Sequence, residues 1–416
     1  MMRRASLFLS VLLVAFSVVG VASAADNWPQ FRGPSGDGRS DGQGLPIVWD
    51  ESTNIRWRTP LHGRGWCSPV VWGNQIWLTT ATEDGTAMSA ICVDRETGEI
   101  QQDIKLFHNE EPQFCHALNS YASPSPVIEE GRVYVHFGSY GTACLDTKTA
   151  ETIWKRRDLP CDHWRGPGSS PILFDGMLIV HFDGHDFQYV VALDKETGET
   201  IWRQDRDIEY GTDDGDLMKA YCTPIVVEVE GQPQLISPAA KATLAYDPYT
   251  GKEQWRIRYE QHSTTARPLF GHGRFFINTG FPRAQLWAVR IGGQGDITDT
   301  HVDWRVAKSV PSMPSQLLVG QLIYMIHDGV ATCLEAKTGR TVWQQRIAGK
   351  YSASPLFVDG KIYFFSQEGK ATVIRAGDSY EQLALNELGD GFMASPAVTG
   401  RSLILRSRSH LYRIEE

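Results

Sequence analysis

The chain has 416 residues, of which 42% are hydrophobic and 21% are charged, a composition typical of folded globular proteins rather than disordered ones. Its 49 acidic residues outnumber its 40 basic residues, which gives a formal net charge of −9. An acidic chain without clusters of Lys and Arg matches neither nucleic-acid backbones nor anionic membrane surfaces, so we expect neither partner.

The N-terminus has the pattern of a signal peptide. A basic start at residues 1–4 precedes an apolar run at residues 7–21, and the small residues 22–24 follow it. This pattern predicts cleavage before Ala25 and an exported protein, periplasmic or secreted, that is not inserted in a membrane once cleaved. Loss of Arg3 and Arg4 changes the net charge from −9 to −11. The alternative is an uncleaved membrane anchor.

One sequence unit recurs along the rest of the chain. Each unit opens with a Ser-Pro-like step and a short apolar run, followed by a Gly turn, two further apolar strands and a fourth strand that carries Trp. The spacing of about 47 residues is typical of four-stranded propeller blades, which must stack because a lone blade cannot cover both its faces. The sequence therefore predicts an all-β, eight-bladed β-propeller of antiparallel blades with starts at Pro69, Pro126, Pro171, Pro224, Pro268, Ser315, Pro355 and Pro396.

The turn between the third and fourth strands has its own pattern. It reads Asp-x-x-Thr-Gly at residues 94–98, 194–198 and 247–251, and a close variant with Glu in place of Asp follows at 335–339. Asp can accept hydrogen bonds from the backbone two residues on, and Gly takes a positive φ without strain. A Trp four residues after the Gly position should cover the next blade, as at Trp154, Trp202, Trp255 and Trp343, with Trp304 in the fifth unit.

The eighth unit lacks its fourth strand, because the chain ends shortly after the third strand at residues 410–413. Residues 54–58 have the pattern of a fourth strand without a blade, so we expect this segment to complete the eighth blade and close the ring. Residues 25–53, with Trp28, Phe31 and the Gly-rich stretch 36–38, would then be an arm that lies across the closure, and residues 54–416 would form the propeller.

A propeller with Asp-x-x-Thr-Gly turns and Trp in the fourth strand resembles the quinoprotein-like (PQQ-like) repeat superfamily over roughly residues 54–416. That superfamily includes quinone-dependent alcohol dehydrogenases and the propeller lipoprotein of the outer-membrane assembly machine. The arm sequence at residues 28–34 and the Gly-Gly-Gln-Gly-Asp-Ile run at 292–297 look like a bacterial exported subgroup. The shared motifs are specific for the propeller fold. They are not specific for an activity.

The cysteines are seven in number, so at least one thiol is free. Cys92, Cys144 and Cys333 occupy the same place in three units and are expected to be small core residues. Cys115 and Cys161 lie in longer loops and could form a disulfide.

Loop lengths indicate which face could bind something. We call the four strands of each blade A to D, in chain order. The A–B and C–D turns are short, whereas the D–A connections between blades and the B–C connections are long and emerge together on one face. The polar and aromatic residues of these long loops are the candidate ligand- or partner-binding residues: His116, Asn119, Tyr121, His163, Trp164, Arg165, Asp183, His185, Asp186, Asp213, Asp216, Lys219, Tyr221, His262 and Arg267.

Two metal sites are conceivable on this face. His181, Asp183 and His185 alternate along a strand and suit zinc, and the run at residues 213–216 offers carboxylates to calcium. A structural strand histidine and an acidic turn explain the same residues more simply, so no metal site is assigned.

The sequence favours a non-catalytic scaffold that binds an envelope protein or a small ligand through this face. None of the usual hydrolase, phosphate-loop, zinc-protease or haem motifs is present. The main alternative is an oxidoreductase that holds pyrroloquinoline quinone (PQQ) and calcium, with a base such as Asp183, although the adjacent cysteine pair of the alcohol dehydrogenases is missing. A third possibility is carbohydrate binding or hydrolysis around Trp164. No cofactor is assigned.

Overall fold

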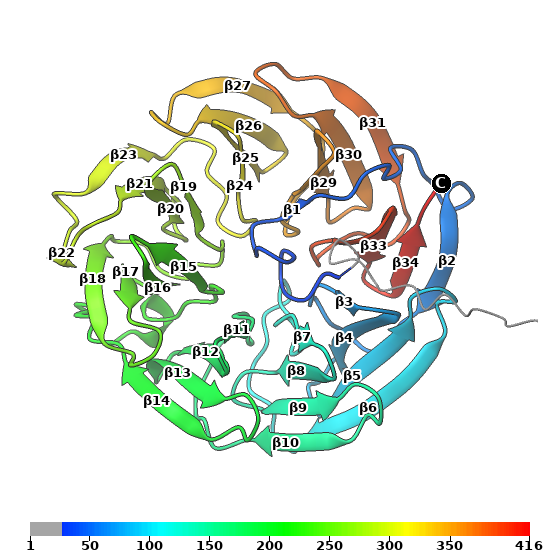
Figure 1. The fold of residues 1–416 in the computed structure, drawn as a ribbon, viewed down its shortest axis with the longest axis horizontal. Coiled ribbons are helices and arrows are strands. Elements are labelled where there is room, and N and C mark those ends of the chain that lie inside the picture. The colour runs from blue at the N-terminus through cyan, green and yellow to red at the C-terminus, as the bar shows by residue number, and fades with distance from the viewer. Residues whose placement is uncertain (1–26) are drawn as a thin grey trace, which may run out of the picture.

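In the computed structural model, which describes residues 27–416, eight four-stranded antiparallel sheets form a ring (Figure 1). The first strand of each sheet lies nearest the centre, and the sheets are the blades of the propeller. The first four blades comprise β3 (Val70–Trp72), β4 (Gln75–Ala81), β5 (Ala87–Asp94) and β6 (Ile100–His108); β7 (Val127–Glu129), β8 (Arg132–His136), β9 (Thr142–Asp146) and β10 (Thr152–Arg156); β11 (Ile172–Phe174), β12 (Met177–Asp183), β13 (Gln188–Asp194) and β14 (Thr200–Asp205); and β15 (Ile225–Val229), β16 (Gln232–Pro238), β17 (Ala242–Tyr246) and β18 (Glu253–Arg258).

The other four blades confirm the predicted number of eight. They comprise β19 (Leu269–Gly271), β20 (Arg274–Asn278), β21 (Leu286–Arg290) and β23 (Val302–Val306); β24 (Leu317–Val319), β25 (Leu322–His327), β26 (Val330–Glu335) and β27 (Thr341–Arg346); β28 (Leu356–Val358), β29 (Lys361–Phe365), β30 (Lys370–Arg375) and β31 (Gln382–Glu387); and β32 (Ala397–Thr399), β33 (Ser402–Arg406), β34 (His410–Ile414) and β2 (Ile55–Pro60). Two short strands, β1 (Arg39–Ser40) and β22 (Gly295–Asp296), extend β28 and β18 in parallel, and the 3₁₀ turn η2 (Gly215–Leu217) precedes the fourth blade.

The turns between the third and fourth strands are built as the sequence predicts. In the first blade the Asp94 carboxylate accepts hydrogen bonds from the backbone N–H groups of Glu96 and Thr97, and Gly98 has φ of +77°. The indole of Trp154 in β10 donates to the Lys195 carbonyl of the next blade at 2.9 Å, and Trp202, Trp304 and Trp343 make the corresponding bond across their own blade boundaries. Each such Trp therefore joins two blades, and its burial contributes about 3 kcal/mol.

The ring closes as predicted. Strand β2 pairs antiparallel with β34, so that Ile55 lies opposite Ile414 and Pro60 opposite His410. The Trp57 indole then donates to the Arg95 carbonyl of the first blade at 2.9 Å, in the same way as the other blade-joining Trp residues. The first and last parts of the propeller are thus held by backbone pairing and by the repeated Trp contact, and no sheet edge is left between them.

The segment at residues 27–44 enters the central channel, which the sequence did not predict. Asn27 lies beside the A–B turn of the first blade, where its side chain accepts from Gly73 N–H, and Trp28 pairs with Val71 of β3. The chain then reaches the starts of the innermost strands of the blades. It returns along β28, with which β1 pairs. We call residues 27–44 the plug; Figure 1 shows it crossing the centre of the disc.

The rest of the arm lies across the seventh and eighth blades, as expected for a segment at the closure. Trp49 is buried and stacks on Tyr363 and Phe365, and its backbone N–H donates to the Asn386 side chain at 3.0 Å. One cluster of buried apolar side chains includes Trp28, Trp49 and residues of the seventh, eighth and first blades. The arm therefore shares the core of the ring.

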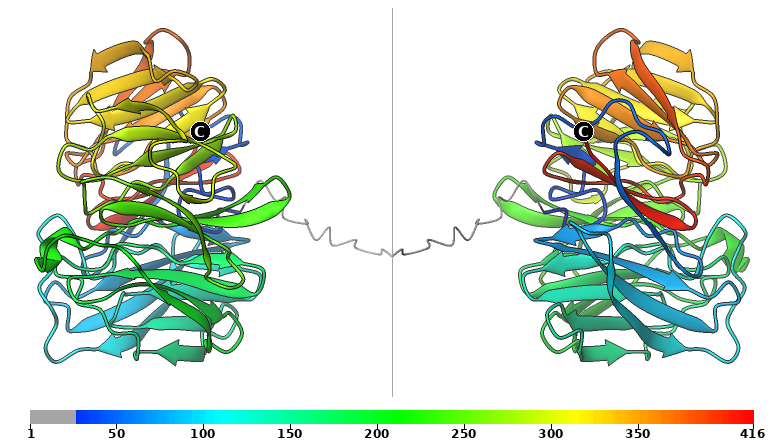
Figure 2. Two further views of the ribbon diagram at one scale, coloured as in Figure 1. Left: turned by 90° about the vertical axis from the view of Figure 1, so that its left-hand side faces the viewer. Right: turned by 90° about the vertical axis from the view of Figure 1, so that its right-hand side faces the viewer.

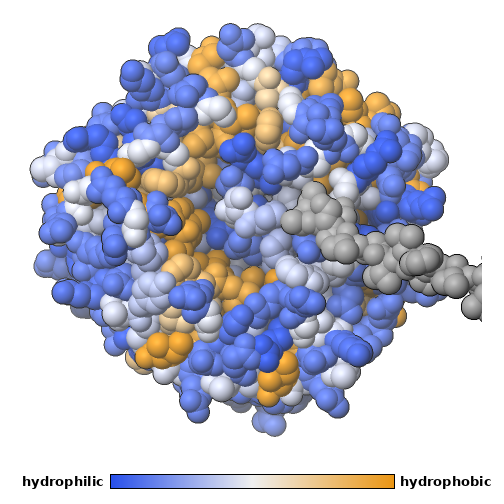
Figure 3. Space-filling view, viewed as in Figure 1, coloured by the Kyte–Doolittle hydropathy of each residue, from blue (hydrophilic) through white to orange (hydrophobic). Residues whose placement is uncertain are grey.

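The disc has two different faces (Figure 2). The face from which the plug enters carries the A–B and C–D turns. In Figure 3 this face is hydrophilic at its edge, with apolar side chains gathered nearer the centre. The D–A and B–C loops emerge on the opposite face. No helix among residues 27–416 is long and apolar enough to cross a membrane. The predicted signal peptide and its cleavage site lie outside the described residues.

All seven cysteines of the chain are free thiols, so Cys115 and Cys161 are not joined. Cys92, Cys144 and Cys333 are fully buried in the sheets, as their shared place in the repeat predicts. Burial raises the pKa of each of these three thiols to about 12, which keeps them protonated and unreactive at neutral pH.

Candidate functional site

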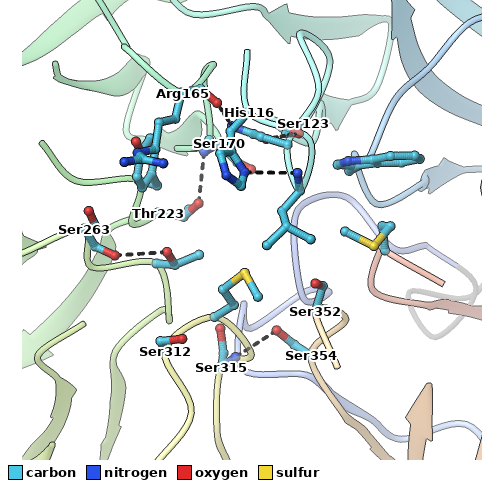
Figure 4. Close-up of a pocket in the computed structure, with 18 of the residues that line it drawn as sticks. His116, Ser123, Arg165, Ser170, Thr223, Ser263, Ser312, Ser315, Ser352 and Ser354 are labelled. Atoms are coloured by element: carbon cyan, nitrogen blue, oxygen red, sulfur yellow. Dashed lines mark hydrogen bonds between the residues drawn. The ribbon is translucent and has the colours of Figure 1, made fainter. Parts of the chain in front are cut away.

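A cavity of about 470 Å³, which we call the funnel, lies on the face that carries the D–A and B–C loops, and Figure 4 shows residues that line it. Its size is within the range of ligand-binding pockets. The ring of Phe31, at the tip of the plug, lines its inner end. Seven of the candidate residues line the funnel: His116, Asn119, Arg165, Asp216, Lys219, Tyr221 and His262.

A ring of hydroxyl groups surrounds the neck of the funnel. In seven blades the residue at the start of the inner strand is Ser or Thr, and each hydroxyl accepts a hydrogen bond from a backbone N–H of the preceding blade at 2.8–3.2 Å. Figure 4 draws two of these contacts, Ser170 to Thr223 and Ser315 to Ser354. All seven hydroxyl side chains are buried and line the funnel: Ser68, Ser125, Ser170, Thr223, Ser315, Ser354 and Ser395. We call them the hydroxyl ring.

Arg267 takes the place of the hydroxyl in the fifth blade. An arginine side chain has no acceptor, so the sequence of contacts is interrupted there. The guanidinium instead donates to the carbonyls of Pro224, Phe31 and Gly36 at 3.1, 2.7 and 3.1 Å. Arg267 therefore holds the tip of the plug in place. In this way it supports the inner end of the funnel.

The plug is fitted closely around two buried arginines. Arg32 donates to the Gln316 carbonyl at 2.6 Å, and burial lowers its pKa to about 9, so it stays charged at neutral pH. A Cβ at Gly36 would lie 2.1 Å from Arg267 Nη1, and one at Gly38 would lie 2.6 Å from Arg32 Nη2. These two glycines, with φ of +66° and +81°, explain the Gly-rich stretch of the arm.

One wall of the funnel is charged. Lys219, whose side chain is 1% exposed, donates to the carbonyl and the carboxylate of Asp216, and Arg165 donates to the same carboxylate at 3.3–3.4 Å. Burial acts to raise the pKa of Asp216, but the hydrogen bonds from Lys219 and Arg165 outweigh it and lower that pKa. Burial lowers the pKa of Lys219. The three groups together carry one net positive charge at neutral pH.

Two histidines extend this wall. His116 Nδ1 accepts from the backbone N–H of Leu118 at 3.1 Å, so the other ring nitrogen carries the hydrogen of a neutral imidazole. His262 is buried, and burial together with the charge of Lys219 lowers its pKa, which keeps it neutral. The wall thus combines loops that precede the second, third, fourth and fifth blades.

Other candidate residues support the blades instead of lining the funnel. Asp183 is buried and forms a two-pronged ion pair with Arg206, at 2.5 and 2.7 Å. This carboxylate is occupied and shielded, which argues against a role as a catalytic base. Tyr121 donates to the Gln113 carbonyl at 2.6 Å, and the buried His163 accepts from the backbone N–H of Ser139 at 3.0 Å.

The remaining candidates lie on the outer part of the same face. Trp164 is 40% exposed, and its ring centroid lies 5.1 Å from that of His185 and 6.3 Å from that of Phe114. Asp186 accepts from the backbone N–H of Asp162 at 2.6 Å, and Asp213 is exposed. Asp186 lines a separate cavity, and these candidates do not converge on one point. We call the exposed apolar side chains of this face, Phe114, Leu118, Trp164 and Phe281, the rim.

Neither metal possibility has a suitable set of ligands. The His181 ring bonds to the Cys222 carbonyl and to the Ser237 hydroxyl, so its two nitrogens are occupied. Asp214 accepts from Asp216 N–H at the start of η2, which is the role of an acidic turn. Among residues 27–416, no group of three or more His, Cys, Asp and Glu side chains is placed to hold a metal ion.

The sequence analysis missed the uncharged part of the funnel. The hydroxyl ring was visible only as the Ser-Pro-like step that marks each repeat, and Phe31 only as part of an arm. The further lining residues with large apolar side chains are Trp66, Leu118, Phe281, Met313 and Met393. An alignment of the repeats on the residue before each Pro would have revealed the hydroxyls, because propeller symmetry places equivalent residues around one axis.

A β-propeller with a plugged channel and a funnel on the opposite face is the class of protein defined by this geometry. The chain belongs to the family described as outer membrane protein assembly factor BamB, whose model matches residues 39–157 and 186–416. Among curated proteins, none matches the chain.

Several solved structures have the same fold at low sequence identity. BamB from Moraxella catarrhalis is 11% identical with a TM-score of 0.59, over 86% of this chain and 99% of that one. Quinohemoprotein alcohol dehydrogenase from Comamonas testosteroni is 12% identical with a TM-score of 0.67, over 95% and 81%. A europium-containing methanol dehydrogenase is 11% identical with a TM-score of 0.65, over 92% and 89%. These likenesses show the shared fold.

The funnel residues do not fit calcium with a quinone. Calcium takes six to eight oxygen ligands, mostly from carboxylates and carbonyls. Asp216 is the single carboxylate among the lining residues of the described chain, and Lys219 and Arg165 already pair with it.

Proposed function

We propose that this protein is a non-catalytic binding protein of the BamB-like propeller family, and that it binds through the funnel and the rim around its mouth. The observation that carries the proposal is the blind end of the funnel. Because the plug fills the inner end, a ligand or partner segment can enter and leave only through the face with the long loops. A cavity that is open at one end only is suited to holding a ligand or a segment of a partner.

The rim supports a partner of appreciable size. The large apolar side chains exposed on this face include Phe114 at 60%, Leu118 at 49%, Trp164 at 40% and Phe281 at 55%. Exposed aromatic side chains beside a polar pocket are typical of protein interaction sites. The family description names an outer-membrane assembly factor, which favours an envelope protein as the partner.

The location that fits this proposal is outside the cytoplasm. The signal-peptide pattern of residues 1–24 and the family description both favour export to the periplasm. Cell fractionation followed by N-terminal sequencing would test it, with a mature chain that starts at Ala25 as the expected result. A full-length chain in the cytosolic fraction would contradict it.

A capture experiment from envelope extract tests the binding role. The bait would be the wild-type chain, a rim variant that combines Trp164→Ser with Phe281→Ser, and a control with Tyr249→Ser. Tyr249 is a 48% exposed aromatic residue on a C–D turn at the opposite face. We expect partners retained by the wild type and the control to be lost by the rim variant. Equal retention by all three baits would contradict the proposal.

A further inference from the structure

The funnel has an excess of hydrogen-bond donors. Each hydroxyl of the hydroxyl ring uses its oxygen to accept a backbone N–H, and none of the seven donates a hydrogen bond within residues 27–416. These hydroxyls are at most 6% exposed. A buried donor without an acceptor is unfavourable, so the ring is suited to a ligand or ordered solvent that supplies acceptor oxygens.

Tyr221 adds a further donor on the charged wall. Its hydroxyl is buried and has no hydrogen-bond partner in the described chain, and Tyr221 lines the funnel together with Arg165 and the hydroxyl ring. Burial and the negative charge of Asp216 raise the pKa of Tyr221 well above its usual value, against the influence of Arg165, so the phenol keeps its proton. It can therefore donate.

Arg165 has donor capacity to spare. Its bonds to Asp216 are long, at 3.3–3.4 Å, and its Nη1 makes no bond within residues 27–416. With Lys219 it leaves one net positive charge beside Tyr221. A monoanion would balance that charge, and the planar guanidinium matches the geometry of a carboxylate.

The opposite side of the funnel is uncharged. It is lined by Met313 and Met393 together with Ser312 and Ser352, all from loops that precede the sixth to eighth blades (Figure 4). Methionine side chains adapt to ligands of varied shape. A ligand that fills both sides would therefore have an acidic end and an apolar body.

From this arrangement we infer that the funnel binds a monocarboxylate with an apolar body, whose carboxylate lies against Arg165, Lys219 and Tyr221 and whose body lies against Met313 and Met393. The inference rests on the proposed binding function and names the chemistry of the bound group. A small carboxylic acid and the free C-terminus of a polypeptide share this chemistry.

A cation is a poor alternative, because Asp216 is the single carboxylate of the lining and is already paired. A neutral sugar is also disfavoured, because sugar hydroxyls need acceptors as well as donors and such sites normally supply carboxylate or amide oxygens. The surplus of donors specifically favours an oxyanion.

Isothermal titration calorimetry of the full chain tests this inference with two matched pairs of probes. The first pair is hexanoate and hexanamide. The second pair is a hexapeptide that ends in leucine, with a free carboxylate or with a C-terminal amide. We expect the acid of at least one pair to bind at least tenfold more tightly than its amide. The pair that shows this preference identifies the source of the carboxylate.

Two variants locate the site. Arg165→Gln should weaken binding of the acid about tenfold, whereas Arg340→Gln, at an exposed arginine on the other face, should leave it unchanged. Tyr221→Phe removes an unpartnered buried hydroxyl, so it should maintain or raise the melting temperature while it weakens binding of the acid. Tyr249→Phe is its control and should change neither property.

Equal binding of acids and amides, or no binding of either acid, would overturn the inference. So would an unchanged affinity in both Arg165→Gln and Tyr221→Phe. These outcomes differ from failure of the proposed function, because loss of captured partners in the rim variant would still show a binding face even if no carboxylate enters the funnel.

Discussion

The two ends of the central channel are built on different principles. At the plugged end, Arg32 and Arg267 donate to backbone carbonyls and glycines allow close approach, so the plug is tightly packed, even though Trp28 Nε1 and two nitrogens of Arg32 have no hydrogen-bond partner within residues 27–416. At the open end, the hydroxyl ring and the unpartnered Tyr221 hydroxyl line the funnel, where a ligand or solvent can supply acceptors. Donors without a partner in the plug are enclosed by the fold, whereas those that line the funnel can be reached by a ligand.

The same contrast applies to apolar side chains. Trp28 in the plug is 2% exposed, and Gly33 lies against its ring, whereas Trp164 at the rim is 40% exposed. The plugged end therefore contributes to stability and the mouth to binding.

The largest effect is expected from removal of the segment that closes the ring. Deletion of residues 27–60 removes the plug, Trp49 and strand β2, which together form part of the shared apolar core. We expect loss of the cooperative melting transition in far-ultraviolet circular dichroism, because an open eighth blade exposes a sheet edge and apolar surface.

A shorter deletion separates the contribution of the plug from that of ring closure. Removal of residues 27–44 leaves β2 and Trp49 in place, so we expect a folded chain with a lowered melting temperature and an open inner end of the channel. Near-native melting of the 27–60 deletion would contradict the role of β2, and near-native melting of the 27–44 deletion would contradict that of the plug.

Acid should destabilise the half of the ring near the charged wall by several kcal/mol. Burial lowers the pKa of His136 to about 3 and that of His163 to about 4 from the usual 6.5, and lowers the pKa of His181 well below 6.5. Below pH 6.5 the unfolded chain binds protons that the folded chain does not, so stability is full above pH 6.5 and falls as the pH drops toward 4. The slope is about 1.4 kcal/mol per pH unit for each histidine.

Urea denaturation between pH 7 and pH 4.5 measures this slope. His136→Gln keeps a partner for the Thr142 hydroxyl, which lies 2.8 Å from His136 Nδ1, and should reduce the slope by about one histidine's share. An unchanged slope in this variant would show that other groups cause the acid sensitivity.

The fold was largely predictable because each repeat carries its own signals. These signals are the Asp-x-x-Thr-Gly turn, the following Trp and the displaced fourth strand. The contacts of each are made with neighbours a few residues away or one blade away. The pattern at residues 54–58 could therefore be matched to the missing strand of the eighth blade, and Trp57 bonds to Arg95 as its equivalents do in other blades.

The site was predictable only as a face. His116, Arg165 and Lys219 line the funnel, but Asp183 and Arg267 came from the same kind of loop and have structural partners. Those partners are distant in the sequence or lie in the arm, so loop position could not separate the two roles. The hydroxyl ring exists only once eight blades surround one axis, and its members individually resemble ordinary turn residues.

Glycine substitutions should distinguish the plug from an ordinary turn. Gly36→Ala places a methyl group 2.1 Å from Arg267 Nη1 at a φ of +66°, whereas Gly131→Ala in an A–B turn meets no atom within 4 Å at a φ of +79°. We expect about 1 kcal/mol of destabilisation for Gly131→Ala from backbone strain alone and about 3 kcal/mol for Gly36→Ala. Equal losses in chemical denaturation would show that the plug tip adapts freely.

The smallest effect on stability is expected at the rim. Trp164→Ala removes a side chain that contacts Phe114 and His185 on an exposed surface, so the free energy of unfolding should change by less than about 0.5 kcal/mol. Trp28→Ala, the matched change in the plug, should cost about 3–5 kcal/mol because it leaves a cavity. If Trp164→Ala were as destabilising as Trp28→Ala in urea denaturation, the rim would be part of the folding core, and its exposed aromatic side chains would no longer argue for a binding surface.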